Sequence, residues 1–246
     1  MIRLKSWSRL VVTGGRVRGV RFDGRPKLRV AEMGISEGGA QGDVLGFIFD
    51  RGFTMERALD AKRLKTIEDL IRSGDERVEL IDGEIVYRPM ARSEHALVQS
   101  GISDEISPFK RKEGRDGWWI MTEVSVCYNE HQCPCHDLAG WRKSRVPNRP
   151  TGLMRIPPDW VCEIISPGHE SKDVFHHLIM LQRNGVPNYW IISPEDKTLI
   201  AYALSGGSYH VGFSVVCESP AALGKVRIPP FEELDIDLRY VFGYEG

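Results

Sequence analysis

The sequence predicts an α/β domain with a parallel or mixed sheet, and residues 160–193 carry the main evidence. Residues 160–165 are apolar except for one carboxylate, which is typical of a buried strand. Apolar residues then recur at helical spacing over 173–183, and residues 189–192 form a second apolar run. A strand, a helix and a strand within about 35 residues have the size of a crossover unit, which joins parallel strands.

The length and composition fit an ordinary globular protein. The 246 residues suffice for one substantial domain, or for a domain with an appendage. Hydrophobic residues make up 41% and charged residues 27%, and the net charge of -1 neither indicates nor excludes a locally basic cleft. The five cysteines are odd in number and irregularly spaced, so no disulfide framework is expected. Because the sequence shows no signal peptide and no long apolar run, the expected compartment is the cytoplasm.

Residues 1–54 differ in composition from the rest of the chain. Basic residues precede a glycine-rich stretch over 34–46, and alternation over 10–12 and 16–22 favours a short hairpin. Two interpretations stay open for this N-terminal extension: a basic arm that binds nucleic acid, or an irregular, poorly ordered segment. The second is favoured because the segment has little apolar surface to bury. We therefore place the α/β domain at residues 55–246.

The other expected elements follow from local signals. Asp82-Gly83 suits a type I′ turn and joins two short apolar strands into a hairpin. Ser93 is the expected N-cap of the next helix, because its hydroxyl can accept a hydrogen bond from the first turn. The remaining elements are a helix over 55–73, hairpin strands over 78–81 and 84–87, and strands over 118–128, 138–141, 197–204 and 209–216.

Three carboxylates, Glu79, Asp137 and Glu163, lie at or beside predicted strands among apolar residues. Glu163 stands out because a carboxylate in the middle of a buried strand is costly unless it is paired or holds a cation. Carboxylates that converge repel one another unless they share a proton or a metal ion. Oxygen ligands favour Mg²⁺ or Mn²⁺, so the pattern indicates a divalent-cation site, with hydrogen-bonded structural carboxylates as the alternative.

Two further patterns admit both a functional and a structural interpretation. Cys133-Pro134-Cys135-His136, with His131 before it, has metal-ligating residue types. Zinc is not favoured there, because the cysteines are too close and no second cysteine pair follows. The basic loop, residues 142–155, is either a contact to the DNA backbone or a solvated loop, and its cations are Arg142, Lys143, Arg145, Arg149 and Arg155.

These residues, in this order, resemble the Uma-type restriction endonuclease family of the PD-(D/E)XK nuclease superfamily. The resemblance rests on VELIDGEIV (78–86), His95, HDLA (136–139), PDWVCEIISP (158–167) and GVPNYWII (185–192). It runs from about Met55 to the C-terminus and leaves the N-terminal extension outside. It implies a restriction-endonuclease-like mixed β-sheet flanked by helices, with a divalent-metal site for phosphodiester hydrolysis.

By position, the resemblance assigns Asp137 and Glu163 as metal-binding carboxylates, with the carbonyl of Ile164 as a further ligand to Mg²⁺ or Mn²⁺. Glu79 and His95 correspond to recurrent active-site positions. His95 would orient a water or a phosphate, or else be a hydrogen-bonded histidine on the helix surface.

The sequence departs from the family pattern at two positions. His136 stands where the family usually has Pro, and His177 stands where it has a Lys on the helix after the Ser-Pro turn. A Lys stays charged near neutral pH, whereas the reference pKa of His is about 6.5. Lys172 is the alternative cation, although it lies more than one helical turn earlier.

We therefore expect a metal-dependent endonuclease whose partner is nucleic acid, with DNA favoured, and which has no membrane partner. A homodimer stays open. The alternative is a catalytically weak or inactive module that keeps the nuclease fold and binds nucleic acid or another partner.

Overall fold

The computed structural model describes residues 7–13, 16–21, 29–33, 63–88, 90–165, 172–216, 219 and 224–244, with side chains from residue 63 onward except those of 172–174. The chain divides into two compact units, Met1–Lys62 and Arg63–Gly246. In the first, β1 (Trp7–Thr13) pairs antiparallel with β2 (Arg16–Arg21), which pairs antiparallel with β3 (Arg29–Met33). The antiparallel pair of β1 and β2 is the short hairpin expected in the N-terminal extension, and β3 adds a third strand that was not expected.

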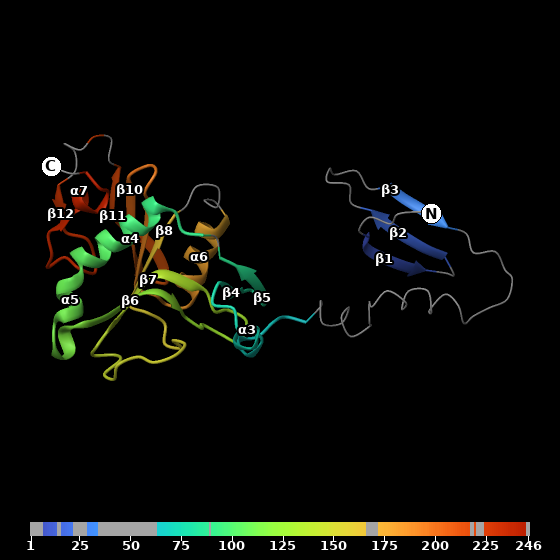
Figure 1. Ribbon diagram of the computed structural model, residues 1–246, viewed down its shortest axis with the longest axis horizontal. Helices are drawn as coiled ribbons and strands as arrows, with labels where there is room; N and C mark the ends of the chain where they lie inside the picture. Colours follow the sequence, from blue (N-terminus) through green and yellow to red (C-terminus); the bar gives the residue numbers. More distant parts are fainter. Residues whose placement is uncertain are drawn as a thin grey trace. The chain divides into compact units, whose positions relative to one another are not determined.

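A six-stranded sheet forms the centre of the second unit (Figure 1). Its strands are β6 (Trp118–Ser125), β7 (Cys135–Arg142), β8 (Trp160–Ile164), β9 (Asn188–Ser193), β10 (Thr198–Ser205) and β11 (Ser208–Val216). Their order is β11-β10-β9-β8-β7-β6. β8 and β9 are parallel and every other neighbouring pair is antiparallel, so the predicted mixed sheet is confirmed.

Short helices and two small sheets surround the central sheet. The helices are α3 (Ile67–Ser73), α4 (Ser93–Glu105), α5 (Ser107–Arg111), the 3-10 turn η1 (Gly114–Asp116), α6 (Lys172–Arg183) and α7 (Leu238–Val241). The small sheets pair β4 (Val78–Ile81) with β5 (Glu84–Tyr87), and β12 (Lys225–Val226) with β13 (Ile236–Asp237). Among the described residues, no helix has the length and hydrophobicity to span a membrane.

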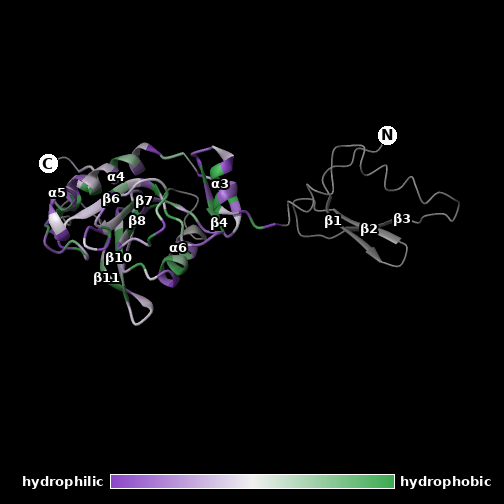
Figure 2. Cartoon of the chain, turned by 90° about the horizontal axis from the view of Figure 1, so that it is seen from below, coloured by the Kyte–Doolittle hydropathy of each residue, from purple (hydrophilic) through white to green (hydrophobic). Residues whose placement is uncertain are grey.

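The two faces of the six-stranded sheet pack against different helices (Figure 1). Alternate residues of a strand point to opposite faces. On β8, Trp160 and Cys162 join a core with α4 and the C-terminal segment, whereas Val161 joins a core with α6. Hydrophobic colouring follows the strands and hydrophilic colouring lies mainly on the outer parts (Figure 2). Since α6 also connects β8 to β9, the predicted crossover unit is confirmed.

Fully buried tryptophans fill much of the space on both faces, namely Trp118, Trp141, Trp160 and Trp190. The rings of Trp160 and Trp190 meet edge to face with centroids 5.2 Å apart. Such a pair adds about 0.5–1.5 kcal/mol beyond its burial. Gly140 on β7 passes between the rings of Trp118 and Trp160, where a Cβ would lie 3.1 and 3.2 Å from them. The glycine is therefore required by this close packing.

Three expected boundaries differ from the structure. The helix expected over 55–73 begins only at Ile67, because Thr66 caps it: the Thr66 hydroxyl accepts from Asp69 N–H, and the Asp69 carboxylate accepts from Thr66 N–H. Residues 55–62 lie outside the described part of the chain. Ser93 is the first helical residue of α4 and not its N-cap. The strand expected over 118–128 ends at Ser125.

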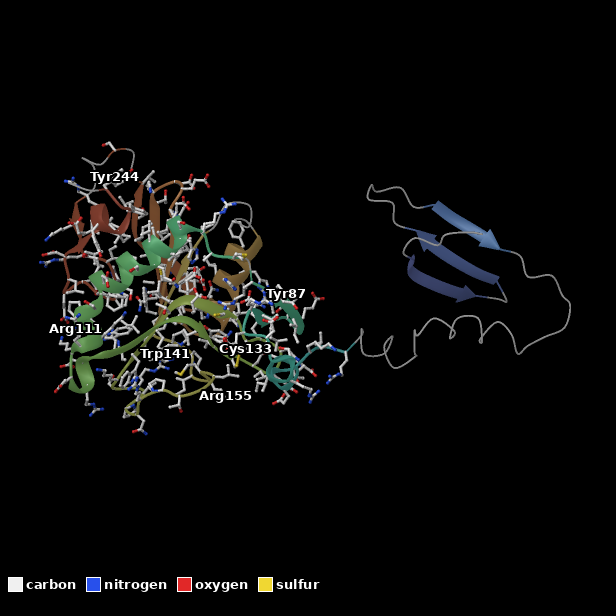
Figure 3. All side chains as sticks on the ribbon, in the orientation of Figure 1. Tyr87, Arg111, Cys133, Trp141, Arg155 and Tyr244 are labelled. Carbon is white, nitrogen blue, oxygen red and sulfur yellow. A yellow bond between two sulfur atoms is a disulfide. The ribbon has the colours of Figure 1, made fainter. Side chains whose placement is uncertain are left out.

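The hairpin of β4 and β5 is attached to the segment before β7. Leu80 exchanges two backbone hydrogen bonds with Cys133, of 3.2 and 2.7 Å. Cys133 forms a disulfide with Cys127, a pairing that was not expected from the sequence. In this state Cys133 cannot be a zinc ligand. Cys133 is fully buried, whereas Tyr87 at the end of β5 is exposed (Figure 3).

Candidate active site

One cleft, of about 570 Å³, brings together six of the seven residues singled out from the sequence. They are Glu79, His95, Asp137, Glu163, Ile164 and His177. They come from β4, α4, β7, β8 and α6, so the cleft lies where helices from both faces reach the same region of the sheet. The seventh, Lys172, is the first residue of α6, and its side chain lies outside the described part of the structure.

Asp137 is in contact with two different elements. Its Oδ1 lies 3.2 Å from Nε2 of His95 on α4. Its Oδ2 accepts a hydrogen bond of 2.7 Å from the backbone N–H of Ile164 on β8. The Asp137 carboxylate beside His95 raises the pKa of His95, against the opposing effect of burial. Asp137 therefore joins α4 to β8 across the cleft.

Glu163 lies deep in the cleft, with a side chain that is 13% exposed. Burial raises its pKa well above the ordinary 4.5, and the charge of Asp137 acts in the same direction. Its Oε1 is 2.5 Å from Nδ1 of His136, and Nε2 of the same ring lies 2.8 Å from the hydroxyl of Tyr128. Burial lowers the pKa of His136 to about 4, so this imidazole is neutral at neutral pH. Sequence reasoning did not predict this Tyr128–His136–Glu163 chain of contacts.

His177 faces the cleft from α6. Its Nδ1 lies 4.0 Å from Oε1 of Glu163, and its side chain is 18% exposed. The position that the sequence resemblance matches to the family's Lys is therefore close enough to bring a cation to Glu163. On the opposite side, Oε2 of Glu79 accepts a 3.0 Å hydrogen bond from the backbone N–H of Cys135. Glu79 thus fixes the β4–β5 hairpin to the start of β7.

Sequence reasoning missed Glu123 on β6. Its Oε1 accepts a 3.0 Å hydrogen bond from Gln99, and its Oε2 forms an ion pair with Arg88. Ligand atoms of His95, Glu123 and Asp137 all lie within 4.8 Å of one another, a spacing that can hold a cation. Glu123 also has a φ of 49°, in the left-handed region, and such strain is found preferentially at functional sites.

Two of these neighbours carried a signal in the sequence. Glu123 is a carboxylate inside a predicted strand, the property that singled out Glu163. Gln99 follows His95 by four residues and so lies on the same side of α4, where its side chain also donates to the carbonyl of Asp137 at 2.8 Å. Arg88, which comes directly after the hairpin, had no distinguishing signal.

Several cations of the basic loop are used inside the domain. Nη1 of Arg145 lies 2.7 Å from Oδ1 of Asp159. Nζ of Lys143 donates to the backbone carbonyl that follows α5, at 2.8 Å. The guanidinium of Arg142 lies 4.6 Å from the centroid of the Trp118 ring. These contacts favour the structural interpretation for the three residues.

A larger cleft, of about 710 Å³, lies on another part of the second unit. Its charged lining residues are of both signs, namely Lys112, Arg115, Asp116, Arg142, Glu232 and Glu233. It contains none of the residues predicted for the active site, and size alone does not identify a reactive cleft. The smaller cleft is the candidate active site because carboxylates and imidazoles converge in it.

The fold of this chain is similar to that of a solved structure. The crystal structure of a putative nuclease belonging to DUF820 from Anabaena variabilis ATCC 29413 matches with a TM-score of 0.58 and 23% sequence identity, over 72% of this chain and 97% of that chain. At this identity the likeness establishes the fold. No curated protein matches the chain.

The chain also matches a family by its sequence. The family model Uma2, described as a putative restriction endonuclease, matches residues 64–214, which include the whole candidate active site. The resemblance seen in the sequence motifs is thereby confirmed. The chain belongs to the Uma2 family of putative restriction endonucleases.

Proposed function

We propose that this protein is a metal-dependent nuclease that hydrolyses phosphodiester bonds of nucleic acid, with DNA as the favoured substrate. The observation that carries the proposal is the position of Asp137. It lies in one cleft with Glu163 and Ile164 of β8 and with His95 of α4, in a chain that belongs to a restriction endonuclease family. Residues 55–246 would form the nuclease domain and residues 1–54 a separate extension.

The donor groups fit a hard divalent cation. Asp137 belongs to two candidate ligand sets: the one that the resemblance assigns, with Glu163 and the carbonyl of Ile164, and one with His95 and Glu123. The first offers only oxygen and suits Mg²⁺, whereas the second adds one imidazole, which Mn²⁺ also accepts. A bound cation would polarise a phosphate and make water more acidic.

The electrostatics of the carboxylates support the same proposal. The charge of Asp137 helps to raise the pKa of Glu163, so the two carboxylates are costly to keep ionised together. A cation beside them would remove that cost. His95, whose pKa is raised by Asp137, is suited to hold a phosphate oxygen as a charged donor.

The second candidate function is a binding module with little or no catalysis. It is favoured by His177, because an imidazole carries less positive charge at neutral pH than the Lys of the family. The two candidates differ in what they predict for turnover but not for binding of nucleic acid.

The test is nicking of supercoiled plasmid by the full chain, with Mg²⁺, with Mn²⁺ and with EDTA. We expect cation-dependent nicking by the wild type and its loss in Asp137→Ala. Asp235→Ala is the matched control, because Asp235 is exposed and paired with Arg227 outside the cleft. If neither DNA nor RNA is cut with either cation while nucleic acid is still bound, the binding module is the better description.

A further inference from the structure

His136 is a fully buried ionisable residue beside the active-site cleft. Its side chain is 0% exposed, and a buried polar ring is costly unless both nitrogens have partners. Here the two partners are side chains, the carboxylate of Glu163 at Nδ1 and the hydroxyl of Tyr128 at Nε2. Each ring nitrogen thus has a partner, and the partner of Nδ1 is a proposed metal-binding carboxylate.

Two directions are possible for these hydrogen bonds, and they correspond to the two tautomers of the ring. A neutral imidazole has one N–H, so one ring nitrogen donates and the other accepts. When the Tyr128 hydroxyl donates to Nε2, the N–H must be on Nδ1 and point at Glu163. This arrangement stabilises an ionised Glu163, which is the form that binds a cation.

His136 cannot itself bind a ligand from the cleft. It has no exposed surface, and Nδ1 is already occupied by Glu163. Its chemistry reaches the cleft only through the carboxylate. His136 differs in this respect from His95 and His177, which line the cleft directly.

We propose that His136, oriented by Tyr128, is a positioning residue that holds the Glu163 carboxylate for cation binding. This inference rests on the proposed function, since it concerns the same cation. It gives a role to a position at which this chain departs from the Pro that is usual in the family. Hydrogen-bonding partners of metal ligands typically change metal affinity by about 10–100-fold when they are removed.

The experiment measures Mn²⁺ binding directly, by calorimetry and by the loss of the free Mn²⁺ signal in electron paramagnetic resonance, without any substrate. His136→Leu introduces an apolar side chain of similar size and removes the hydrogen-bond donor. We expect the dissociation constant for Mn²⁺ to rise about 10–100-fold. His136→Asn keeps an N–H donor near the Nδ1 position, so we expect affinity within about threefold of the wild type. Tyr128→Phe removes only the hydroxyl and should weaken binding about fivefold.

The variants separate positioning from a purely structural role. A structural role predicts that Leu and Asn at position 136 change affinity equally, or not at all, and either result overturns the proposal. Thermal unfolding in EDTA checks that each variant is folded. If His136→Leu does not fold, Tyr128→Phe decides, because an unchanged affinity in that variant contradicts the orienting contact.

Asp137→Ala distinguishes a failure of this inference from a failure of the proposed function. If Asp137→Ala abolishes Mn²⁺ binding and His136→Leu leaves it unchanged, only the role of His136 is wrong. If the wild type binds no Mn²⁺, or binds it equally well without the Asp137 carboxylate, the proposed cation site is wrong and the inference on His136 fails with it.

Discussion

Asp159 lies directly before the short strand β8 and Glu163 lies near the end of that strand, and both have largely buried side chains, 7% and 13% exposed. Asp159 accepts a 2.8 Å hydrogen bond from the backbone N–H of Arg142 and pairs with the guanidinium of Arg145 at 2.7 Å. Glu163 meets the neutral His136 and the like charge of Asp137. The two carboxylates are four residues apart in the sequence, and their electrostatic surroundings are opposite in sign.

The comparison shows how a structural carboxylate differs from a reactive one. Burial alone does not distinguish them, because both are removed from water. A carboxylate whose charge is compensated inside the protein has little to gain from an external cation. One that faces another carboxylate across a cleft is stabilised when a cation binds.

The largest expected effect comes from neutralising Glu163, and the same change at Asp159 serves as the comparison. Glu163→Gln should lower the single-turnover rate of plasmid nicking by about 10³-fold, because it removes a charge that faces the reacting phosphate region. Asp159→Asn keeps an acceptor for the Arg142 N–H and lies outside the cleft, so we expect its rate to stay within about threefold. Equal losses in the two variants would remove the basis of the comparison.

A permanent cation beside Glu163 should assist the reaction by acting on the substrate phosphate. His177→Lys places a permanent positive charge at a position now 4.0 Å from the Glu163 carboxylate, where it can also stabilise charge developing on a phosphate. We expect Mg²⁺-dependent nicking to rise about 10²-fold over the wild type.

Lys172→Ala is the control for that experiment. If His177→Lys leaves the rate unchanged while Lys172→Ala alone abolishes nicking, Lys172 is the working cation. Nicking that survives in the double variant His177→Lys with Lys172→Ala shows that Lys172 is not needed.

Removing the Arg145 guanidinium that pairs with Asp159 should affect stability more than activity. Arg145→Ala leaves a buried carboxylate with one hydrogen bond, and the Arg145 side chain is 43% exposed, which moderates the cost. We expect the free energy of unfolding in urea to fall by about 1–2 kcal/mol. The matched control, Arg149→Ala, changes an exposed loop residue and should stay within about 0.5 kcal/mol. A loss of the same size in both variants would show that the ion pair is not responsible.

The two ends of β8 should also differ in their response to pH. A carboxyl with a raised pKa binds its proton more tightly when folded, so Glu163 makes the unfolding free energy fall as the pH rises above 4.5. His136, whose pKa falls from 6.5 to about 4, makes it rise with pH between those two values. Glu163→Gln removes only the first effect. In EDTA, its stability relative to the wild type should therefore increase with pH, as measured by urea unfolding at several pH values.

The smallest effect is expected from the N-terminal extension. The unit from Arg63 onward contains both cores and the whole cleft, so deletion of residues 1–54 should change its urea stability by less than about 1 kcal/mol. The comparison between Asp159 and Glu163 should be unaffected. A loss of several kcal/mol would show that the extension is an integral part of the nuclease domain.

The fold could be predicted largely because its central signals are local. The apolar runs of β8 and β9, with an amphipathic helix between them, have the length and composition that a parallel crossover requires. The Asp82-Gly83 turn specified the hairpin in the same way. The start of α3 was harder to predict. The residues before Thr66 have a helical pattern, but Thr66 caps the helix through its contact with Asp69.

The site could be predicted only in part because its remaining contacts are long-range. Glu163 attracts attention in the sequence as a charge in an apolar run, but its partner His136 is 27 residues away. The ion pair of Arg88 with Glu123 spans 35 residues. Pairings of this kind depend on how strands and helices meet, and no periodicity within either segment encodes them. The disulfide of Cys127 with Cys133 was missed because cysteine spacing by itself does not fix a pairing.

The edge-to-face pair of Trp160 and Trp190 gives the protein an intrinsic spectroscopic reporter. Trp160 lies on β8 between Asp159 and Glu163, and the two indoles are close enough for their electronic transitions to couple. Near-ultraviolet circular dichroism follows the fixed packing of aromatic rings in a folded core. A change of twist in β8, whether it begins at the ion pair or at the cleft, would therefore be visible in the native protein without any attached label.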